Sequence, residues 1–163
     1  MLEFKTTSPE ETFEFGQCLA KVLSAGQVVC LVGDLGAGKT LLVQGLAAGL
    51  DIQDAINSPT FTILNVYEAK FPVYHFDLYR LEDAEELYDI GFDEYTEGDG
   101  LSIIEWPDKF PDQLPDEYLW IEINSDFVNN GGKVNERVIR ISALGTAYEH
   151  ICEELKQICP FLP

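Results

Sequence analysis

Eight consecutive residues, 33–40, have the types and the spacing of a phosphate-binding loop. They read Gly-Asp-Leu-Gly-Ala-Gly-Lys-Thr, which satisfies the pattern G-x-x-x-x-G-K-[ST]. Glycines let the backbone curl until successive N–H groups face one anion, and a following helix adds the positive end of its dipole. Lys39 would bring a positive charge to the β- and γ-phosphates, and Thr40 a hydroxyl ligand for Mg²⁺. The loop predicts binding of a nucleotide with its metal ion.

Two carboxylates end apolar runs further along the chain, and each is a candidate for chemistry beside this loop. Asp77 follows His75 and Phe76, and Glu105 follows the apolar residues 101–104. Ligands bind α/β sheets outside the carboxyl ends of the strands, so both side chains are well placed. A phosphate-binding loop needs such a group to hold the metal ion or to activate water. Because the chain has 29 acidic residues, a merely solvated strand end is the alternative for each.

Three further features have two interpretations each. The segment 58–60, Ser-Pro-Thr, lies where the switch segments of P-loop proteins sense the γ-phosphate, but it also fits a proline turn before a strand. Arg80 could pair with phosphate or with the acidic helix expected after it. Trp106 is either a core or rim residue or a platform beside the nucleotide.

The rest of the chain predicts the elements that would hold these groups. Ser8 as N-cap with Pro9 and Glu11 opens a helix that Gly26 ends, and Val28–Val32 is a buried strand. The other predicted strands are 61–67, 73–78 (antiparallel to the one before), 101–104, 118–123 and 134–141, with a turn at 129–132. The other predicted helices are 39–50, 83–90 and a last one that a capping box at 146–149 opens and that runs to about 158. This order predicts an α/β fold of the P-loop NTPase kind, a central mixed sheet flanked by helices, in a single domain over 1–163.

Composition excludes several functions. The 163 residues include 10 basic and 29 acidic side chains, which gives a formal net charge of −19. Such a surface repels phosphate backbones and anionic bilayers, so neither tight nucleic-acid binding nor membrane binding is expected. No signal sequence or long apolar run is visible, so we expect a cytoplasmic protein with four free cysteines. Neither the cysteines nor the two histidines have zinc-ligand spacing.

The acidic residues are concentrated in one stretch. Residues 82–108 contain eleven acidic side chains and no basic one. A solvated face explains this stretch, and so does a docking surface for a basic partner, since opposite patches speed encounter and set orientation.

The loop alone leaves several classes open. The chain lacks the N-K-x-D and D-x-x-G motifs of small GTPases. A kinase for a small metabolite is an alternative, although such kinases usually cluster arginines and this chain has only Arg80, Arg137 and Arg140. A non-catalytic module whose binding depends on nucleotide is another.

The order of the motifs resembles the TsaE family, also called YjeE, of small bacterial P-loop ATPases. Between Gly33 and Trp106 the chain has G-D-L-G-A-G-K-T, S-P-T-F, Y-H-F-D-L-Y-R-L and I-E-W. The resemblance implies a cytoplasmic Mg²⁺-dependent ATPase, weak alone, in the machinery that makes threonylcarbamoyladenosine in tRNA. It also implies two partners, TsaB and TsaD, of which TsaD transfers the threonylcarbamoyl group to tRNA. ATP binding would let the ATPase join this pair, and hydrolysis would permit further turnover.

The resemblance also implies roles for single residues. Asp77 and Trp106 match positions important for activity, and Thr40 and Glu105 match the metal ligands. The residues expected to be catalytic are Lys39, Asp77 and Glu105. The residues expected to contact ATP or ADP are Pro9, Gly33, Asp34, Leu35, Gly36, Ala37, Gly38, Lys39, Thr40, Thr60, Trp106 and Arg137.

Overall fold

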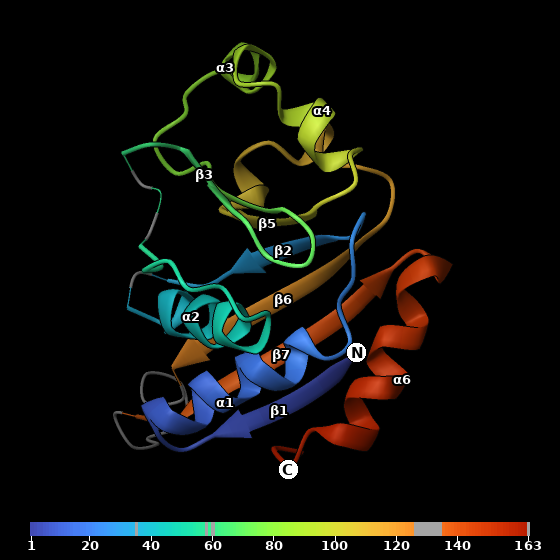
Figure 1. Ribbon diagram of the computed structural model, residues 1–163. Helices are drawn as coiled ribbons and strands as arrows, with labels where there is room; N and C mark the ends of the chain where they lie inside the picture. The colour runs from blue at the N-terminus through green and yellow to red at the C-terminus, as the bar shows by residue number, and fades with distance from the viewer. Residues whose placement is uncertain (35, 58, 60, 126–134, 163) are drawn as a thin grey trace.

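The computed structural model describes residues 1–34, 36–57, 59, 61–125 and 135–162. Within them, seven strands form one mixed sheet in the order β1-β7-β6-β2-β5-β4-β3 (Figure 1). The strands are β1 (Leu2–Thr6), β2 (Val28–Val32), β3 (Leu64–Tyr67), β4 (Val73–Asp77), β5 (Leu101–Glu105), β6 (Tyr118–Ser125) and β7 (Arg137–Leu144). Strands β6, β2, β5 and β4 run parallel, whereas β1, β7 and β3 pair antiparallel with their neighbours. The predicted α/β class and mixed sheet are confirmed.

Helices cover both faces of this sheet. On β2, Val29 and Leu31 pack into one apolar cluster, and Val28 and Cys30 into another, because side chains of a strand alternate between its faces. The first cluster includes side chains of α1 (Pro9–Ala20), α2 (Lys39–Gly49) and α6 (Glu149–Ile158). The second includes those of the short helices α3 (Ala84–Asp89) and α4 (Phe92–Thr96). Figure 1 shows α1 and α2 lying side by side against the sheet.

The start of α1 follows the prediction, and its end does not. The Ser8 hydroxyl accepts a hydrogen bond from Glu11 N at 3.2 Å, and Pro9 is the first helical residue. The Glu11 carboxylate accepts from Thr7 N rather than from the cap residue. The helix ends at Ala20, six residues before Gly26, so the predicted stop at Gly26 is wrong.

Other boundaries differ for local reasons. Strand β3 begins at Leu64 rather than at residue 61, because Ile63 has a left-handed φ of 68° and its N–H donates to Pro59 O in a turn. The expected capping box at 146–149 is wrong: residues 146–148 form a 3-10 turn, and α6 begins at Glu149 without a side-chain cap. The Tyr148 hydroxyl instead accepts from Val28 N at 2.7 Å.

Several elements lie outside what the sequence predicted. Strand β1 at the sheet edge, helix α4 and the 3-10 turns at 107–109 and 111–113 were not expected. The C-terminal segment returns beside β1, where Lys5 N donates to Phe161 O. The predicted turn at 129–132 and the start of the predicted strand at 134 lie outside the described residues.

The four cysteines are free, as predicted, and three of them are buried. Burial raises the pKa of the Cys30 thiol and of the Cys159 thiol to about 12, so these two groups remain protonated and unreactive at neutral pH. Among the helices that the structure describes, none is long and apolar enough to cross a bilayer.

Candidate functional site

The glycine-rich segment joins the end of β2 to the start of α2. Gly38, at the N-cap of α2, has a φ of 107°, which side chains rarely adopt, and no side chain caps this helix end. At Gly33 an added Cβ would collide with the backbone oxygen of Ile123. Both positions therefore require glycine, and the first N–H groups of α2 lie at the loop without a side-chain acceptor. This is the geometry that an anion needs at a helix N-terminus.

Lys39, the first residue of α2, is held inside this site. Its Nζ donates to Gly33 O at 2.6 Å and lies 4.1 Å from the centroid of the Trp106 ring. Burial lowers the pKa of Lys39, while the charges of Glu105 and Asp77 act in the opposite direction. Lys39 is therefore a buried cation whose charge the nearby carboxylates balance.

Trp106 lies at the rim of the site. Its ring stacks on Lys39 and packs 4.8 Å from the ring of Tyr79, between centroids. The residue is half-buried and has a left-handed φ of 58°. The position of Trp106 beside Lys39 is compatible with both interpretations, a rim residue and a platform at the edge of the site.

The two strand-end carboxylates lie side by side. Asp77 and Glu105 are in register at the ends of the parallel strands β4 and β5, so both project from the same face of the sheet. They are 4% and 3% exposed, which is not the exposure of solvated strand ends. An Asp77 oxygen accepts from Tyr79 N at 3.0 Å. Glu105 Oε2 lies 2.7 Å from His75 Nε2.

His75 has no role in the predictions from sequence, yet it contacts the site directly. It is 1% exposed and lies two residues before Asp77 on β4, with which it shares a face because strand side chains have a period of two. This spacing of two residues is the feature of the sequence that could have indicated that His75 and Asp77 lie on one face of the sheet. The contact with Glu105 depends on how β4 and β5 align, which the sequence does not state.

Arg137 lies a hundred residues from the loop in sequence but supports it in space. Its Nε donates to Ala37 O at 2.7 Å and its Nη1 to Glu136 O at 2.9 Å. Arg137 also lines a small pocket, together with Pro9, Thr12, Gly38, Leu41 and Asn135. The structure thus brings Pro9 and Arg137, expected near the nucleotide, to the same side of the loop.

The remaining predicted site residues divide into three groups. Asp34 and Thr40 are exposed at the loop, so their side chains are accessible to a ligand. Leu35, Ser58 and Thr60 lie outside the described residues. Arg80 lies with its guanidinium 4.8 Å from the ring centroid of Phe61, a contact that neither expected pairing foresaw.

The acidic stretch 82–108 does not form one surface. Glu105 is buried in the site, whereas the carboxylates on α3 and α4 are exposed. Two of the exposed carboxylates have structural contacts. Asp83 caps α3 by accepting from Glu85 N, and Glu86 accepts from Glu82 N and Asp83 N.

Fold and site define an α/β protein with a mixed sheet and a glycine-rich strand-to-helix loop over paired, buried carboxylates. The family model described as threonylcarbamoyl adenosine biosynthesis protein TsaE matches residues 6–134. The chain belongs to the TsaE family, a family of threonylcarbamoyladenosine biosynthesis proteins.

Individual relatives agree along most of the chain. The Bacillus subtilis tRNA threonylcarbamoyladenosine biosynthesis protein TsaE is 43% identical over 157 residues, 96% of this chain and 94% of that protein. The Synechocystis TsaE is 47% identical over 71% of this chain and 76% of its own. The crystal structure of Bacillus subtilis YdiB superimposes with a TM-score of 0.80 at 38% identity, covering 96% of this chain and 94% of the other.

Proposed function

We propose that this protein is a Mg²⁺-dependent ATPase that serves threonylcarbamoyladenosine modification of tRNA. We further propose that it acts by nucleotide-dependent association with a TsaB–TsaD pair. The observation that carries the proposal is the buried Lys39, held between a glycine-rich loop at an uncapped helix N-terminus and two buried carboxylates. The relatives, which bear the name of this modification, supply the pathway.

The binding roles follow from where each group lies. The N–H groups at the start of α2 and the Lys39 ammonium would hold the β- and γ-phosphates of ATP or ADP. The side chains of Pro9, Leu41 and Arg137 lie beside Gly38 around a small pocket, so they would contact the nucleotide beyond its phosphates. Phosphate oxygens would displace the Gly33 carbonyl as the partner of Nζ, because a phosphate accepts more strongly than a neutral carbonyl.

The residues present fit a magnesium ion only together with a nucleotide. In the part of the chain that the structure describes, no group of three His, Cys, Asp or Glu side chains is placed to hold a metal ion. Mg²⁺ keeps several waters and takes one or two protein oxygens plus phosphate oxygens. The Thr40 hydroxyl and the Glu105 carboxylate provide that donor set. When bound, the ion would neutralise charge on the phosphates.

Asp77 and Glu105 would provide the groups that position the attacking water for hydrolysis. Water adds to the γ-phosphorus, the bond to the β–γ bridging oxygen breaks, and ADP, phosphate and a proton are released. Asp77 and Glu105, side by side at the strand ends, can orient that water and accept hydrogen bonds from it. Lys39 stabilises the charge that develops on the γ-phosphate oxygens.

The charge of the molecule bears on how such an ATPase could serve tRNA modification. With a net charge of −19, it is not built to hold tRNA itself. This charge supports the proposal that it acts through nucleotide-controlled association with partner proteins in the cytoplasm.

The decisive experiment measures ATP affinity by calorimetry and phosphate release with and without the TsaB–TsaD pair. We expect micromolar-range binding that needs Mg²⁺, slow release alone and faster release with the pair. ADP release that depends on a small metabolite would indicate a kinase instead. ATP binding without hydrolysis, even with both partners, would indicate a nucleotide-dependent binding module.

A further inference from the structure

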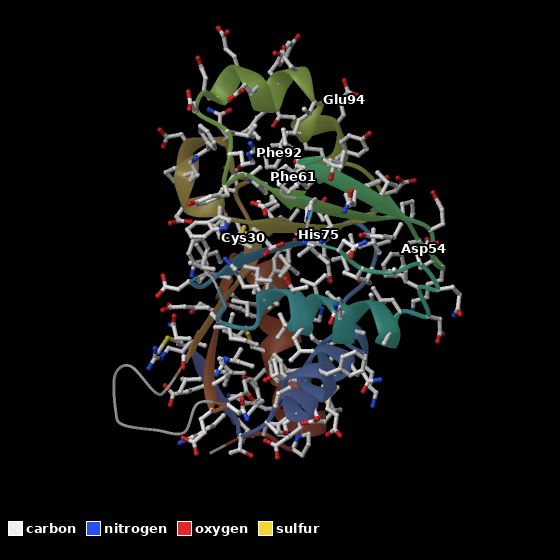
Figure 2. All side chains as sticks on the ribbon, turned by 90° about the vertical axis from the view of Figure 1, so that its left-hand side faces the viewer. Cys30, Asp54, Phe61, His75, Phe92 and Glu94 are labelled. Atoms are coloured by element: carbon white, nitrogen blue, oxygen red, sulfur yellow. The ribbon has the colours of Figure 1, made fainter. Side chains whose placement is uncertain are left out.

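The imidazole of His75 is buried against the candidate metal ligand. His75 lies on β4 and is 1% exposed, and its Nε2 is 2.7 Å from Oε2 of Glu105, itself 3% exposed. Because a carboxylate can only accept, Nε2 is the donor. Figure 2 shows His75 in the interior of the molecule, away from the labelled surface residues Asp54 and Glu94.

The other ring nitrogen is what makes this pair unusual. Among the described residues His75 Nδ1 finds no hydrogen-bond partner, although it is fully buried. A buried polar atom without a partner costs stability, and an apolar side chain of similar volume would avoid that cost. Packing alone therefore does not explain a histidine here. The polar contact that the ring does make is directed at Glu105.

We propose that His75 is a positioning residue that holds the Glu105 carboxylate in the orientation needed to bind the Mg²⁺ of Mg·ATP. This inference rests on the proposed function and deepens it. By donating to Oε2 at 2.7 Å, His75 fixes the rotation of the Glu105 carboxylate. A ligating carboxylate is commonly oriented by such an outer hydrogen bond.

The arrangement of the strands explains why His75 can do this. Glu105 is in register with Asp77, and His75 is in register with Ile103, so His75 lies diagonally from Glu105 across two adjacent parallel strands on one face. The contact is therefore set by the sheet rather than by a flexible loop. A carboxylate held this way needs little reorganisation when a cation arrives.

The test measures how strongly Mg²⁺ increases affinity for a non-hydrolysable ATP analogue, by calorimetry with and without the metal. We call the ratio of the two affinities the Mg²⁺-dependent gain. In His75→Leu we expect this gain to fall about tenfold, while the affinity for the analogue without metal is unchanged. His75→Gln, whose amide N–H can reach the position of Nε2, should recover most of the gain. His75→Asn, whose amide ends short of it, should not. In turnover, KM for Mg·ATP should rise by a similar factor in His75→Leu, and kcat should fall as well, because the Glu105 carboxylate is no longer held in the orientation used in the transition state.

A matched control separates positioning from stability. Ile103→Val removes one methyl group from the residue in register with His75, so it weakens the same part of the sheet without touching a polar group. It should lower the unfolding temperature and leave the Mg²⁺-dependent gain intact. In the Glu105→Gln background, His75→Leu should cause no further loss of that gain, because the oriented carboxylate is gone.

Each outcome decides the question. A normal Mg²⁺-dependent gain in His75→Leu overturns the positioning role, as does an equal loss of metal-free and metal-bound affinity. If His75→Leu does not fold, the comparison of Gln with Asn replaces it, and equal behaviour of these two overturns the inference. A wild-type protein that binds the analogue without any Mg²⁺ effect refutes the proposed function as well, whereas a normal wild-type effect with an unchanged variant refutes only the role of His75.

Discussion

Two groups of carboxylates from neighbouring parts of the sequence have opposite environments in the fold. Glu105 ends a central parallel strand and, with Asp77, lies buried beside Lys39 and His75. The carboxylates of α3 and α4, such as Glu85, are exposed to solvent on short helices at one end of the sheet (Figure 1). The same side chain is therefore a site component in one place and a surface charge in the other. What separates them is the end of a buried strand, not the density of acidic residues.

The difference has an energetic consequence. Burying an ionised carboxylate is costly unless cations or donors compensate it, and Lys39 and His75 provide that compensation for Glu105. An exposed carboxylate remains hydrated and its removal changes little. Substitutions in the buried group should therefore alter nucleotide chemistry, and substitutions in the exposed group should alter encounter with other molecules.

The largest effect is expected from Lys39→Ala. This substitution removes the buried cation of the site, and ATP affinity should fall by about a hundredfold or more, since hydrogen bonds to charged groups contribute about 1.5–3 kcal/mol each. The protein should still fold, because the apolar core is unchanged, but its unfolding temperature should fall, because the buried carboxylates lose a compensating charge. Calorimetry of ATP binding and the thermal unfolding curve check both points. Lys70→Ala, at an exposed lysine, is the control and should bind normally. Equal affinity in Lys39→Ala and wild type would contradict the phosphate-binding role.

The next effect sharpens the comparison between the two groups of carboxylates directly. Glu105→Gln should reduce the hydrolysis rate by about a hundredfold with a much smaller change in ATP affinity, because this carboxylate acts mainly on the charge of the transition state. Glu85→Gln makes the same chemical change on the exposed helix α3 and should leave both quantities unchanged. If affinity in Glu105→Gln collapsed in parallel with rate, Glu105 would be a binding or folding element instead.

Much of the fold could be predicted because its central elements carry strong local signals. Strand β2 is apolar throughout, and the glycine loop and Lys39 follow it, so strand, turn and helix were predictable together. The edge strand β1 was missed because five residues with mixed polarity form a strand only by pairing with β7, far away in sequence. Helix α4 was missed because it has only five residues and follows a left-handed glycine, Gly91, directly after the predicted helix 83–90.

Part of the candidate site could be predicted in the same way. Asp77 and Glu105 were expected to lie at strand ends on one edge of the sheet, and they do, because the end of a buried strand is recognisable from sequence. The contact between His75 and Glu105 was not, since it depends on the register of β4 against β5. Nor could sequence predict that Arg137 donates to Ala37 O, because that contact requires β7 to lie next to β6 in the sheet.

Arg137 allows a third, smaller effect to be tested. Arg137→Ala removes the hydrogen bond to the loop backbone and one wall of the pocket beside Gly38, so ATP affinity should fall about tenfold. Arg140→Ala, on the same strand, removes an arginine whose partner is the half-exposed Glu3, and should bind ATP normally. Titration of both variants with ATP gives the comparison. Equal ATP affinities of the two variants would show that Arg137 neither contacts the nucleotide nor stabilises the loop conformation that binds it.

The smallest effect concerns the exposed carboxylates, where we expect a change in association rate and none in nucleotide binding. Glu85, Asp89 and Glu94 are exposed on α3 and α4, and none of them makes the capping contacts of Asp83 and Glu86. Replacing all three with Lys should slow association with the TsaB–TsaD pair several-fold at low salt, because complementary charge accelerates encounter. The difference should shrink as salt is added, since screening shortens the range of the interaction.

The control for this last prediction makes the same change in net charge at a different place on the molecule. Glu149, Glu153 and Glu154 are exposed on α6, and their triple replacement with Lys alters the total charge by the same amount on another part of the molecule. If the surface of α3 and α4 docks the partner, only the first variant slows association. If both variants slow it equally, the effect is one of net charge, and the stretch is a solvated face. Tight tRNA binding by the isolated wild-type protein at physiological salt would overturn the electrostatic argument, because a surface at −19 should repel a polyanion.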